Sequence, residues 1–267
     1  MRVVIQDNYD KMCLWAASYI KKRITEHNNS SKKDRPFVLG LPTGSSPIGV
    51  YRELVRMNRE GELSFSNVVT FNMDEYLGLP REHDQSYWYF MHDNFFDHLV
   101  DMKPENINIL NGMTDDPEKE CAEYEKKIAS YGGIDLFMGG IGVDGHIAFN
   151  EPFTSLSSRT GVRDLTTDTR IVNSRFFGND PGAVPAQALS VGVGTVTDSK
   201  EVLILINGHN KARALAATVE GPVSSKWTCS ALQMHNGAII ACDERACGEL
   251  TVDTYKYFLD IEKNERL

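Results

Sequence analysis

The sequence lacks any long apolar run. Its longest hydrophobic stretches, such as residues 202–206, have only the length of a β-strand, and the amino terminus shows no apolar signal segment. A membrane-spanning helix needs about 20 mainly apolar residues, and a secretory signal needs an apolar core of its own. We therefore expect a cytoplasmic protein without a membrane partner.

Cysteine is scarce and scattered. The chain holds five cysteines, an odd number, and none of them forms a C-x-x-C pair. This pattern argues against a disulfide framework and against a dithiol redox motif, and it favours reduced thiols in a cytosol. The five residues are Cys13, Cys121, Cys229, Cys242 and Cys247.

Positive charge is in deficit as well. The chain has 28 lysines and arginines against 37 acidic residues, which gives a formal net charge of −9. Such a surface does not suit a nucleic-acid partner, so an anionic ligand has to be bound by a few local cations. The candidates for that role are Arg175 and Lys211.

What the chain does contain is an alternation of helix and strand patterns. With 267 residues, 41% of them hydrophobic, it is long enough to bury one full core. We predict a single α/β domain over residues 1–267, with three layers and a mostly parallel central sheet covered by helices on both faces. The predicted helices are centred on 12–24, 51–55, 121–131 and 212–219, and the predicted strands lie at 37–41, 67–71, 134–138, 202–206 and 238–242.

One polar stretch, residues 154–185, has no clear core pattern. It is rich in Ser, Thr, Arg, Asn and Asp. It could form a mobile lid, but a solvated excursion from the domain is the interpretation that its composition favours.

The most informative segment is Gly139–Pro152. An apolar run at 134–138 precedes it, and its four glycines let the backbone turn tightly and approach a ligand. Asp144, His146 and Glu151 then fall on a loop, close enough in sequence to form one cluster. In such a cluster carboxylates orient an imidazole that can both accept and donate a proton near neutral pH.

Three other interpretations of this segment remain open at this point. Residues 140–145 match G-x-G-x-x-G, the dinucleotide fingerprint, although Pro152 interrupts any long helix and no acidic strand end follows about twenty residues later. The histidine and its carboxylates could also bind a metal, although no second histidine or cysteine lies at ligand spacing. The third alternative is a glycine-rich turn with an ordinary hydrogen-bonded histidine.

Polar residues follow two more predicted strands. The run at 68–71 ends in Asn72-Met73-Asp74-Glu75-Tyr76, which places carboxylates at the edge where open parallel sheets bind ligands. The run at 37–41 ends in a small-residue loop before a helix, with Ser45 or Ser46 as the predicted N-cap and Pro47 at the first helical position. Such a helix start could bind a phosphate, or be an ordinary capped connection.

Together these segments resemble the glucosamine-6-phosphate deaminase family. The resemblance is carried by Leu41-Pro42-Thr43-Gly44, by Phe71–Tyr76 and by Gly145–Pro152, and it continues through 173–177 and 191–195 to Tyr257-Phe258. It covers essentially the whole chain. It implies a Rossmann-like fold of the deaminase/6-phosphogluconolactonase type, and a reaction without metal or cofactor that converts glucosamine 6-phosphate and water into fructose 6-phosphate and ammonia.

The resemblance also implies roles for individual residues. His146, held by Asp144 and Glu151, would open the sugar ring, and Asp74 would move the C2 proton to C1. The phosphate of the sugar would bind at Thr43, Gly44, Ser45, Ser46, Arg175 and Lys211. A lactone hydrolase of the 6-phosphogluconolactonase type would not need Asp74, and a non-catalytic sugar-phosphate sensor would not need the acid–base set. A homo-oligomer is left open.

An allosteric site is the part of the family pattern from which this chain departs. Allosteric members bind N-acetylglucosamine 6-phosphate between subunits. Thr154, Ser155, Arg163 and Tyr257 match positions of that site, but glycine occupies the first cationic position, at 161, and Asp164 replaces a hydroxyl. The loss of one charge-assisted contact is comparable to a whole allosteric coupling energy, so we expect activation to be weak or absent.

Overall fold

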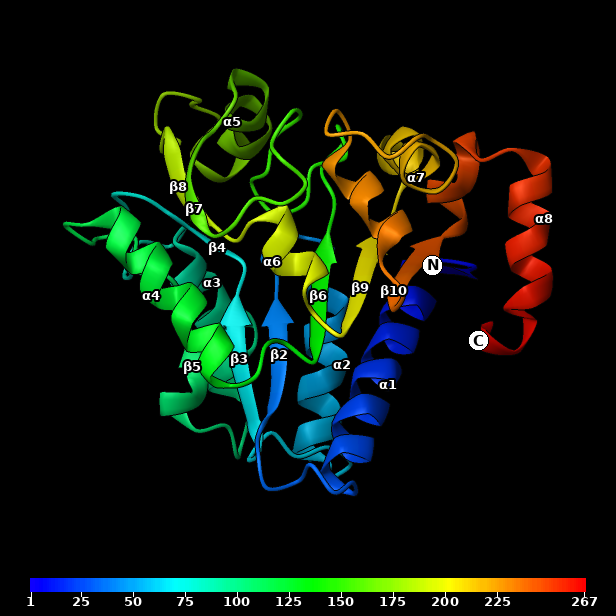
Figure 1. The fold of residues 1–267 in the computed structure, drawn as a ribbon, viewed down its shortest axis with the longest axis horizontal. Helices are drawn as coiled ribbons and strands as arrows, with labels where there is room; N and C mark the ends of the chain where they lie inside the picture. The colour runs from blue at the N-terminus through cyan, green and yellow to red at the C-terminus, as the bar shows by residue number, and fades with distance from the viewer.

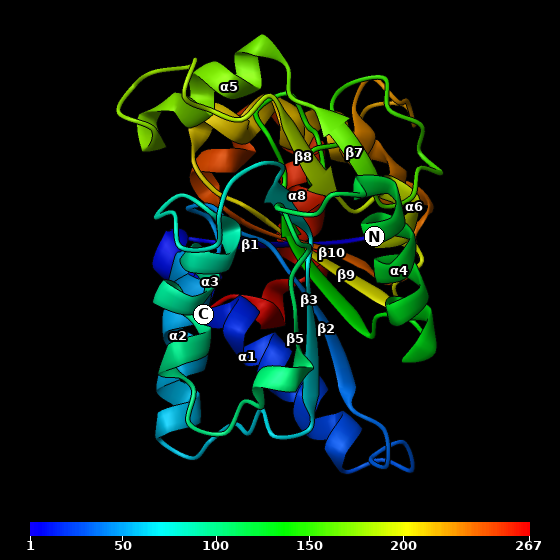
Figure 2. The same ribbon diagram turned by 90° about the vertical axis from the view of Figure 1, so that its left-hand side faces the viewer.

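Seven strands form a parallel sheet in the order β1-β10-β9-β6-β2-β3-β5. This computed structural model describes all 267 residues, and Figures 1 and 2 show the fold. The five predicted strands are all present within two residues of their predicted bounds, whereas the sequence patterns missed β1 and β5. The strands are β1 (Arg2–Gln6), β2 (Phe37–Leu41), β3 (Val68–Asn72), β5 (Ile107–Asn108), β6 (Leu136–Gly140), β9 (Glu201–Ile206) and β10 (Ala238–Asp243).

Helices cover both faces of this sheet, as predicted. Successive strand residues point to opposite faces, so Leu39 packs into the core under α1, α2 and α3, while Val38 packs into the core under α4, α6, α7 and α8. Figure 2 shows α1, α2 and α3 on one side of the sheet and α4 and α6 on the other. The helices are α1 (Tyr9–Asn28), α2 (Ile48–Arg59), α3 (Tyr87–Asn94), α4 (Pro117–Ser130), α5 (Thr167–Asn173), α6 (Val193–Thr197), α7 (Ala212–Val219) and α8 (Val252–Ile261).

None of the helices is both long and apolar enough to cross a bilayer. Short 3-10 turns complete the connections between the helices and strands. The turns are η1 (Phe96–His98), η2 (Pro104–Asn106), η3 (Ser174–Phe176), η4 (His209–Lys211), η5 (Thr228–Met234), η6 (Glu244–Glu249) and η7 (Lys263–Glu265).

A second, antiparallel sheet lies beyond the carboxyl edge of the large one (Figure 1). Its strand order is β4-β8-β7, formed by β4 (Asp74–Tyr76), β8 (Gln187–Ser190) and β7 (Gly161–Asp164). The polar stretch 154–185 contributes β7, α5 and η3 to this region. Leu165 and Val184 from that stretch pack with Tyr76, Phe149 and Ala188 in a small core of their own. Two apolar residues 19 positions apart were too few to show this core in the sequence.

A buried carboxylate holds together the opposite, amino edge of the sheet. Asp135, immediately before β6, accepts hydrogen bonds from the Arg35 guanidinium at 2.6 and 2.8 Å, from Lys200 Nζ at 2.5 Å and from the Val38 N–H at 2.9 Å. Burial by itself would raise the pKa of Asp135, but these donors outweigh it and lower the pKa to about 2. Ionised Asp135 therefore stabilises the fold.

We expect Asp135→Asn to lower the free energy of unfolding at pH 7 by about 2–4 kcal/mol, because two cations would lose their buried partner. A depressed pKa contributes stability above the ordinary carboxyl pKa and loses it as the pH falls through the folded value. In urea titrations the difference between wild type and variant should therefore shrink between about pH 4 and pH 2. Asp198→Asn, in the exposed pair with Arg159, should change stability by less than about 0.5 kcal/mol. A deficit that persisted at pH 2 would contradict this account.

Candidate active site

The loop after β6 turns back on itself and brings its polar side chains together. Two isolated bridges, Ile141 with Ile147 and Ile147 with Asn150, fold residues 141–150 into a compact turn. Gly142 is required here because a Cβ atom would lie 2.6 Å from Nδ1 of His146. Gly145 has a φ of +78°, and a Cβ atom there would lie 2.5 Å from the Trp227 ring. The glycines of the sequence motif therefore make room for the histidine and for the neighbouring segment.

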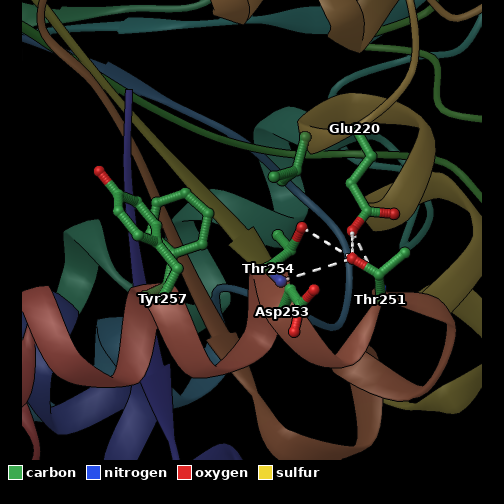
Figure 3. Close-up of a pocket in the computed structure, with 7 residues that line it drawn as sticks. Glu220, Thr251, Asp253, Thr254 and Tyr257 are labelled. Atoms are coloured by element: carbon green, nitrogen blue, oxygen red, sulfur yellow. Dashed lines mark hydrogen bonds between the residues drawn. The ribbon is translucent and has the colours of Figure 1, made fainter.

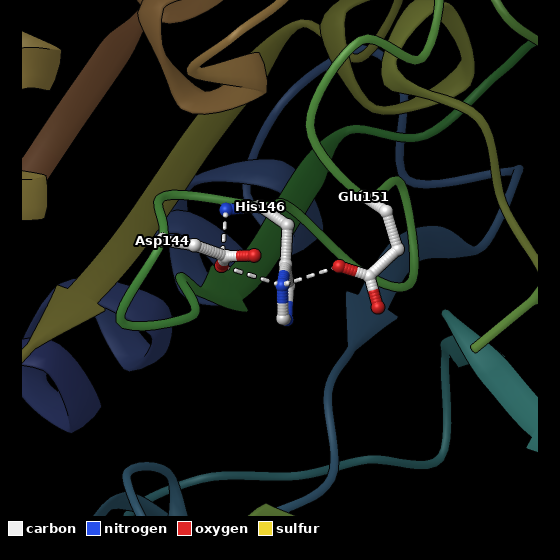
Figure 4. Close-up of side chains that lie close together, drawn as sticks. All are labelled: Asp144, His146 and Glu151. Carbon is white, nitrogen blue, oxygen red and sulfur yellow. Dashed lines mark hydrogen bonds and ion pairs between the residues drawn. The ribbon is translucent and has the colours of Figure 1, made fainter. Parts of the chain in front are cut away.

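Asp144, His146 and Glu151 lie together in this loop (Figure 4). Nδ1 of His146 is 2.7 Å from an Asp144 carboxylate oxygen and 3.7 Å from Oε2 of Glu151. Burial raises the pKa of Asp144, but its contacts with His146 outweigh burial and hold that pKa below its ordinary value. Because both carboxylates face Nδ1, the other ring nitrogen, Nε2, is left without a protein partner.

Glu151 is fixed from its other side by residues that the sequence analysis did not identify. Its Oε1 accepts hydrogen bonds from Thr166 Oγ1 at 3.2 Å and from Thr169 Oγ1 at 2.5 Å. Thr166 is the N-cap of α5, and its side chain also accepts from the Thr169 N–H. The T-x-x-T spacing at a helix start is a capping signal that could have revealed this contact. Helix α5 thus holds one end of the Asp144–His146–Glu151 cluster.

The loop after β6 does not have the geometry of a dinucleotide-binding turn. That fold needs a helix directly after the glycines, with its N-terminus toward the phosphates. Here the next helix, α5, begins only at Thr167, after β7. The metal interpretation keeps geometric support, because one potential ligand atom from each of Asp144, His146 and Glu151 lies within 4.8 Å of the other two.

Asp74 and Glu75 follow β3 but have different surroundings. Glu75 accepts hydrogen bonds from the backbone N–H groups of Tyr76, Tyr87 and Trp88 at 2.8–2.9 Å. Since two of these donors form the first turn of α3, Glu75 fixes that helix. Asp74 is also buried, with 5% of its surface exposed, but its Oδ1 has no partner. Burial, with the charge of Glu75 as a second cause, raises the pKa of Asp74 well above its ordinary value.

The small-residue loop after β2 is not capped as predicted. Pro47, rather than Ser45 or Ser46, occupies the N-cap position of α2, and no side chain caps the helix. The Ser46 hydroxyl instead donates to Oδ1 of Asn207 at 2.7 Å, which joins this loop to the one after β9. The cap prediction was wrong because sequence spacing does not show a partner 161 residues away.

This arrangement leaves the start of α2 suited to an anion. The backbone N–H groups of Gly44, Ser45 and Ser46 donate to no protein acceptor. Gly44 has a φ of +94°, in the left-handed region that favours glycine. Free N–H groups at a helix start attract phosphate and carboxylate groups. The loop including Thr43 therefore forms a candidate anion site.

The two predicted cations differ in exposure. Lys211, at the end of η4, donates from Nζ to the carbonyl of Ile141 at 2.5 Å, so its amine lies at the base of the histidine loop. Burial and then the charge of Arg175 lower the pKa of Lys211 to about 8. Arg175 is exposed on η3, with its guanidinium carbon 4.6 Å from the centre of the Phe176 ring. The effect of Arg175 on Lys211 places the two positive charges in one region.

The four residues matched to an allosteric site do not meet within the chain. Tyr257 lies on α8, which Figure 1 shows at the far side of the molecule from β7. It borders a surface pocket with Glu220, Thr251, Asp253 and Thr254 (Figure 3). Arg163, in β7, donates to the Asn150 side chain and to the carbonyls of Val162 and Arg159. Thr154 and Ser155 lie in the turn after Glu151, where the Ser155 hydroxyl contacts Ser157.

Comparisons with known proteins place this chain in a family. The family model of glucosamine-6-phosphate isomerases and 6-phosphogluconolactonases matches residues 8–241. A glucosamine-6-phosphate deaminase of Parabacteroides distasonis is 59% identical over 99% of this chain and 97% of its own length. The enzyme of that name from Phocaeicola vulgatus is 62% identical over 98% of this chain and 99% of its own length.

Solved structures agree. A monomeric glucosamine-6-phosphate deaminase has a TM-score of 0.87 at 40% identity, covering 92% of this chain and 99% of that one. A 6-phosphogluconolactonase of Leishmania guyanensis has a TM-score of 0.71 at 18% identity, covering 94% and 99% of the two chains, and shows a shared fold alone. The resemblance and the fold type inferred from the sequence motifs are thereby confirmed: the chain belongs to the glucosamine-6-phosphate deaminase family.

Proposed function

We propose that this protein interconverts glucosamine 6-phosphate and water with fructose 6-phosphate and ammonia. The observation that carries the proposal is a juxtaposition at the carboxyl edge of the sheet. A buried, partnerless carboxylate at Asp74 and a histidine held by two carboxylates share this edge with an uncapped helix start and a half-buried lysine. These are the groups that proton transfer on a phosphorylated sugar requires.

His146 would open the sugar ring. The two carboxylates at Nδ1 fix the imidazole and leave Nε2 to face the substrate. The ring opens when the anomeric hydroxyl loses a proton and the ring oxygen gains one, and an imidazole can do both near neutral pH. The product of this step is the open-chain aldehyde of the amino sugar.

Asp74 would carry the proton that isomerises the sugar. Its carboxylate takes the proton from C2 while O1 receives a proton from the ammonium group at C2, so that the enolamine forms, and the carboxyl group then returns its proton to C1. The protonated imine left at C2 adds water and expels ammonia, which yields the ketose. Burial suits Asp74 to this step, because it makes the carboxylate more basic than in water.

The phosphate would bind at the start of α2. Backbone N–H groups of residues 44–46 and the hydroxyls of Thr43 and Ser45 can surround it, while Lys211 and Arg175 supply positive charge. A phosphate anchored there would place the carbon end of the sugar toward the acid–base groups. We propose a sugar phosphate as the partner of this protein.

An assay of the purified protein with glucosamine 6-phosphate tests the proposal. We expect ammonia and fructose 6-phosphate to form in equal amounts, and 6-phosphogluconolactone to remain unhydrolysed above its spontaneous rate. A parallel assay in EDTA should give the same rate, because the proposed steps use only side chains. Loss of activity in EDTA that a divalent metal restored would instead assign Asp144, His146 and Glu151 to an ion. Binding without turnover would indicate a sensor.

We expect substrate binding to weaken above about pH 8, where Lys211 loses its charge. A lowered pKa means that the amine is cationic at pH 7 and neutral at pH 9, so KM should rise across this interval. Lys211→Met should raise KM at pH 7 by about 10–100-fold, because one charge-assisted hydrogen bond is lost. The same variant should show no further rise of KM between pH 7 and pH 9. Lys226→Met, at an exposed lysine, is the control and should leave both features unchanged. An unaltered KM in Lys211→Met would remove Lys211 from the phosphate site.

We expect hyperbolic saturation by glucosamine 6-phosphate that N-acetylglucosamine 6-phosphate does not change. The guanidinium of Arg163 is engaged within the chain, and Asp164, which accepts from Gln187, adds negative charge beside it. Initial rates over a substrate series, with and without the N-acetylated sugar, measure this. A sigmoidal curve that the N-acetylated sugar made hyperbolic would show that the allosteric site is intact.

A further inference from the structure

Helix α5 buries a polar side chain and leaves apolar side chains in solvent. Thr169 is the one buried residue of this helix, whereas Ile171 and Val172 are exposed. A helix at a protein surface normally packs its apolar residues against the core. The burial of Thr169 therefore has to be explained by the contact that its hydroxyl makes.

That hydroxyl donates to Glu151. Oγ1 of Thr169 lies 2.5 Å from Oε1, and both residues are less than a tenth exposed. This separation is typical of a hydroxyl that donates to an ionised carboxylate. Thr166 gives weaker support, because its hydroxyl and its N–H lie 3.2 and 3.3 Å from the same oxygen. Thr169 is thus the main donor to this carboxylate.

The second oxygen of Glu151 faces the histidine. A carboxylate is planar, so a hydrogen bond that fixes Oε1 also sets the direction of Oε2. Oε2 lies 3.7 Å from Nδ1 of His146, and Figure 4 shows the carboxylates of Glu151 and Asp144 on opposite sides of the imidazole. No group of the chain donates a hydrogen bond to Oε2 itself. Its position therefore depends on the contacts that hold Oε1.

Glu151 is the more buried of the two carboxylates beside the imidazole. Its side chain is 10% exposed, against 36% for Asp144, so its charge is screened less by water. When His146 takes the proton of the anomeric hydroxyl, the imidazole becomes a cation. An ionised Glu151 that faces Nδ1 stabilises this cation, and a displaced Oε2 would stabilise it less.

A second T-x-x-T helix start shows what the same arrangement does away from the site. Thr251 is the N-cap of α8, and Glu220 accepts hydrogen bonds from its N–H at 2.9 Å and from its hydroxyl at 2.7 Å (Figure 3). In both helix starts a glutamate from elsewhere in the chain binds the N-cap, a role that a residue inside the helix has in a capping box. No histidine bonds to Glu220, so at α8 the arrangement serves the helix alone.

We propose that Thr169 is a positioning residue for ring opening, because its hydroxyl holds Glu151 where the free carboxylate oxygen stabilises protonated His146. The inference deepens the proposed function, since it rests on His146 opening the sugar ring. Thr169 acts on the substrate only through Glu151 and His146. Its loss should therefore slow ring opening and spare the later proton transfer by Asp74.

Thr169→Val should slow the cyclic sugar selectively. The variant keeps the shape of the side chain but removes the hydroxyl, and should lower kcat for glucosamine 6-phosphate about tenfold while KM changes less than about threefold. The rate with 5-deoxyglucosamine 6-phosphate, which cannot close a pyranose ring, should stay within about threefold of wild type. Thr169→Ser restores the hydroxyl and should restore turnover of the cyclic sugar. A merely structural role would slow both substrates together.

Thr254→Val is the matched control. Thr254 has the place in α8 that Thr169 has in α5, three residues after the N-cap, and its hydroxyl accepts from that of Thr251 at 2.9 Å. The substitution removes a hydroxyl from the same kind of helix start, but at a distance from the histidine. Both substrates should react with the control variant at the wild-type rates.

Crystal structures of wild type, Thr169→Val and Thr169→Ser test the positioning without turnover. We expect Oε2 of Glu151 to face Nδ1 of His146 in wild type and Thr169→Ser, and to be displaced by about 1 Å or more in Thr169→Val. A Glu151 carboxylate that stayed in place, or equal slowing of both substrates, would overturn the proposal. If Thr169→Val does not fold, Thr169→Ala decides by the same criteria. A wild type without deaminase activity would refute the proposed function, and the position of Glu151 in the crystal structures would still decide the role of Thr169.

Discussion

Asp74→Asn should abolish isomerisation and deamination while the variant still binds glucosamine 6-phosphate. An amide cannot take the C2 proton, and loss of a general base costs about 10²–10⁴-fold in rate. We expect kcat to fall by this factor and KM to change little, because the proposed phosphate site lies elsewhere, at the start of α2. Steady-state kinetics and equilibrium binding of the substrate measure the two effects separately.

The neighbouring carboxylate is the control for this prediction. Glu75 is as deeply buried as Asp74, but its oxygens are used by the N–H groups of Tyr76, Tyr87 and Trp88. Glu75→Gln should therefore lower stability while keeping kcat within about tenfold of wild type. If Asp74→Asn retained more than about a tenth of the wild-type kcat, Asp74 would not be the base.

His146→Gln should slow turnover of the cyclic sugar by about 10²–10³-fold, because the ring oxygen loses its proton donor. The same variant should act far better on the 5-deoxy analogue, which lacks the hydroxyl that closes the pyranose ring. The reason is that the proposed mechanism assigns ring opening to His146 and the later proton transfer to Asp74. The measurement is the ratio of kcat/KM for the analogue to that for glucosamine 6-phosphate, in wild type and variant.

Asp74→Asn provides the comparison for this ratio. It should slow both substrates equally, because the C2 proton has to be removed from either. If His146→Gln also slowed both substrates equally, His146 would have to act after ring opening. His83→Gln, at an exposed histidine near Asp84, should leave both rates unchanged.

Local sequence patterns carried most of the fold, whereas contacts between distant residues could not be predicted from them. Residue spacing was enough to predict the parallel sheet and its helical layers, because apolar periodicity over 5 to 20 residues reports which face each element buries. It was also enough to place Asp144, His146 and Glu151 together, because all three lie within one glycine-rich loop. Strands β1 and β5 and the small sheet were missed. Strand β5 and the strands of the small sheet have only two to four residues, and β1 is defined by its pairing with β10 at the other end of the chain.

Tertiary structure decided what each polar side chain does once the chain has folded. Asp74 and Glu75 are adjacent acids in the sequence, yet only the folded chain shows that α3 satisfies Glu75 and leaves Asp74 without a partner. Ser46 has the sequence of a helix cap but bonds to Asn207 instead. The sequence by itself determined the family, the fold class and the kinds of group at the site. Hydrogen-bond partners and desolvation were decided only in three dimensions, because both depend on residues that folding brings together, from 12 positions apart for Glu75 and Tyr87 to 161 for Ser46 and Asn207.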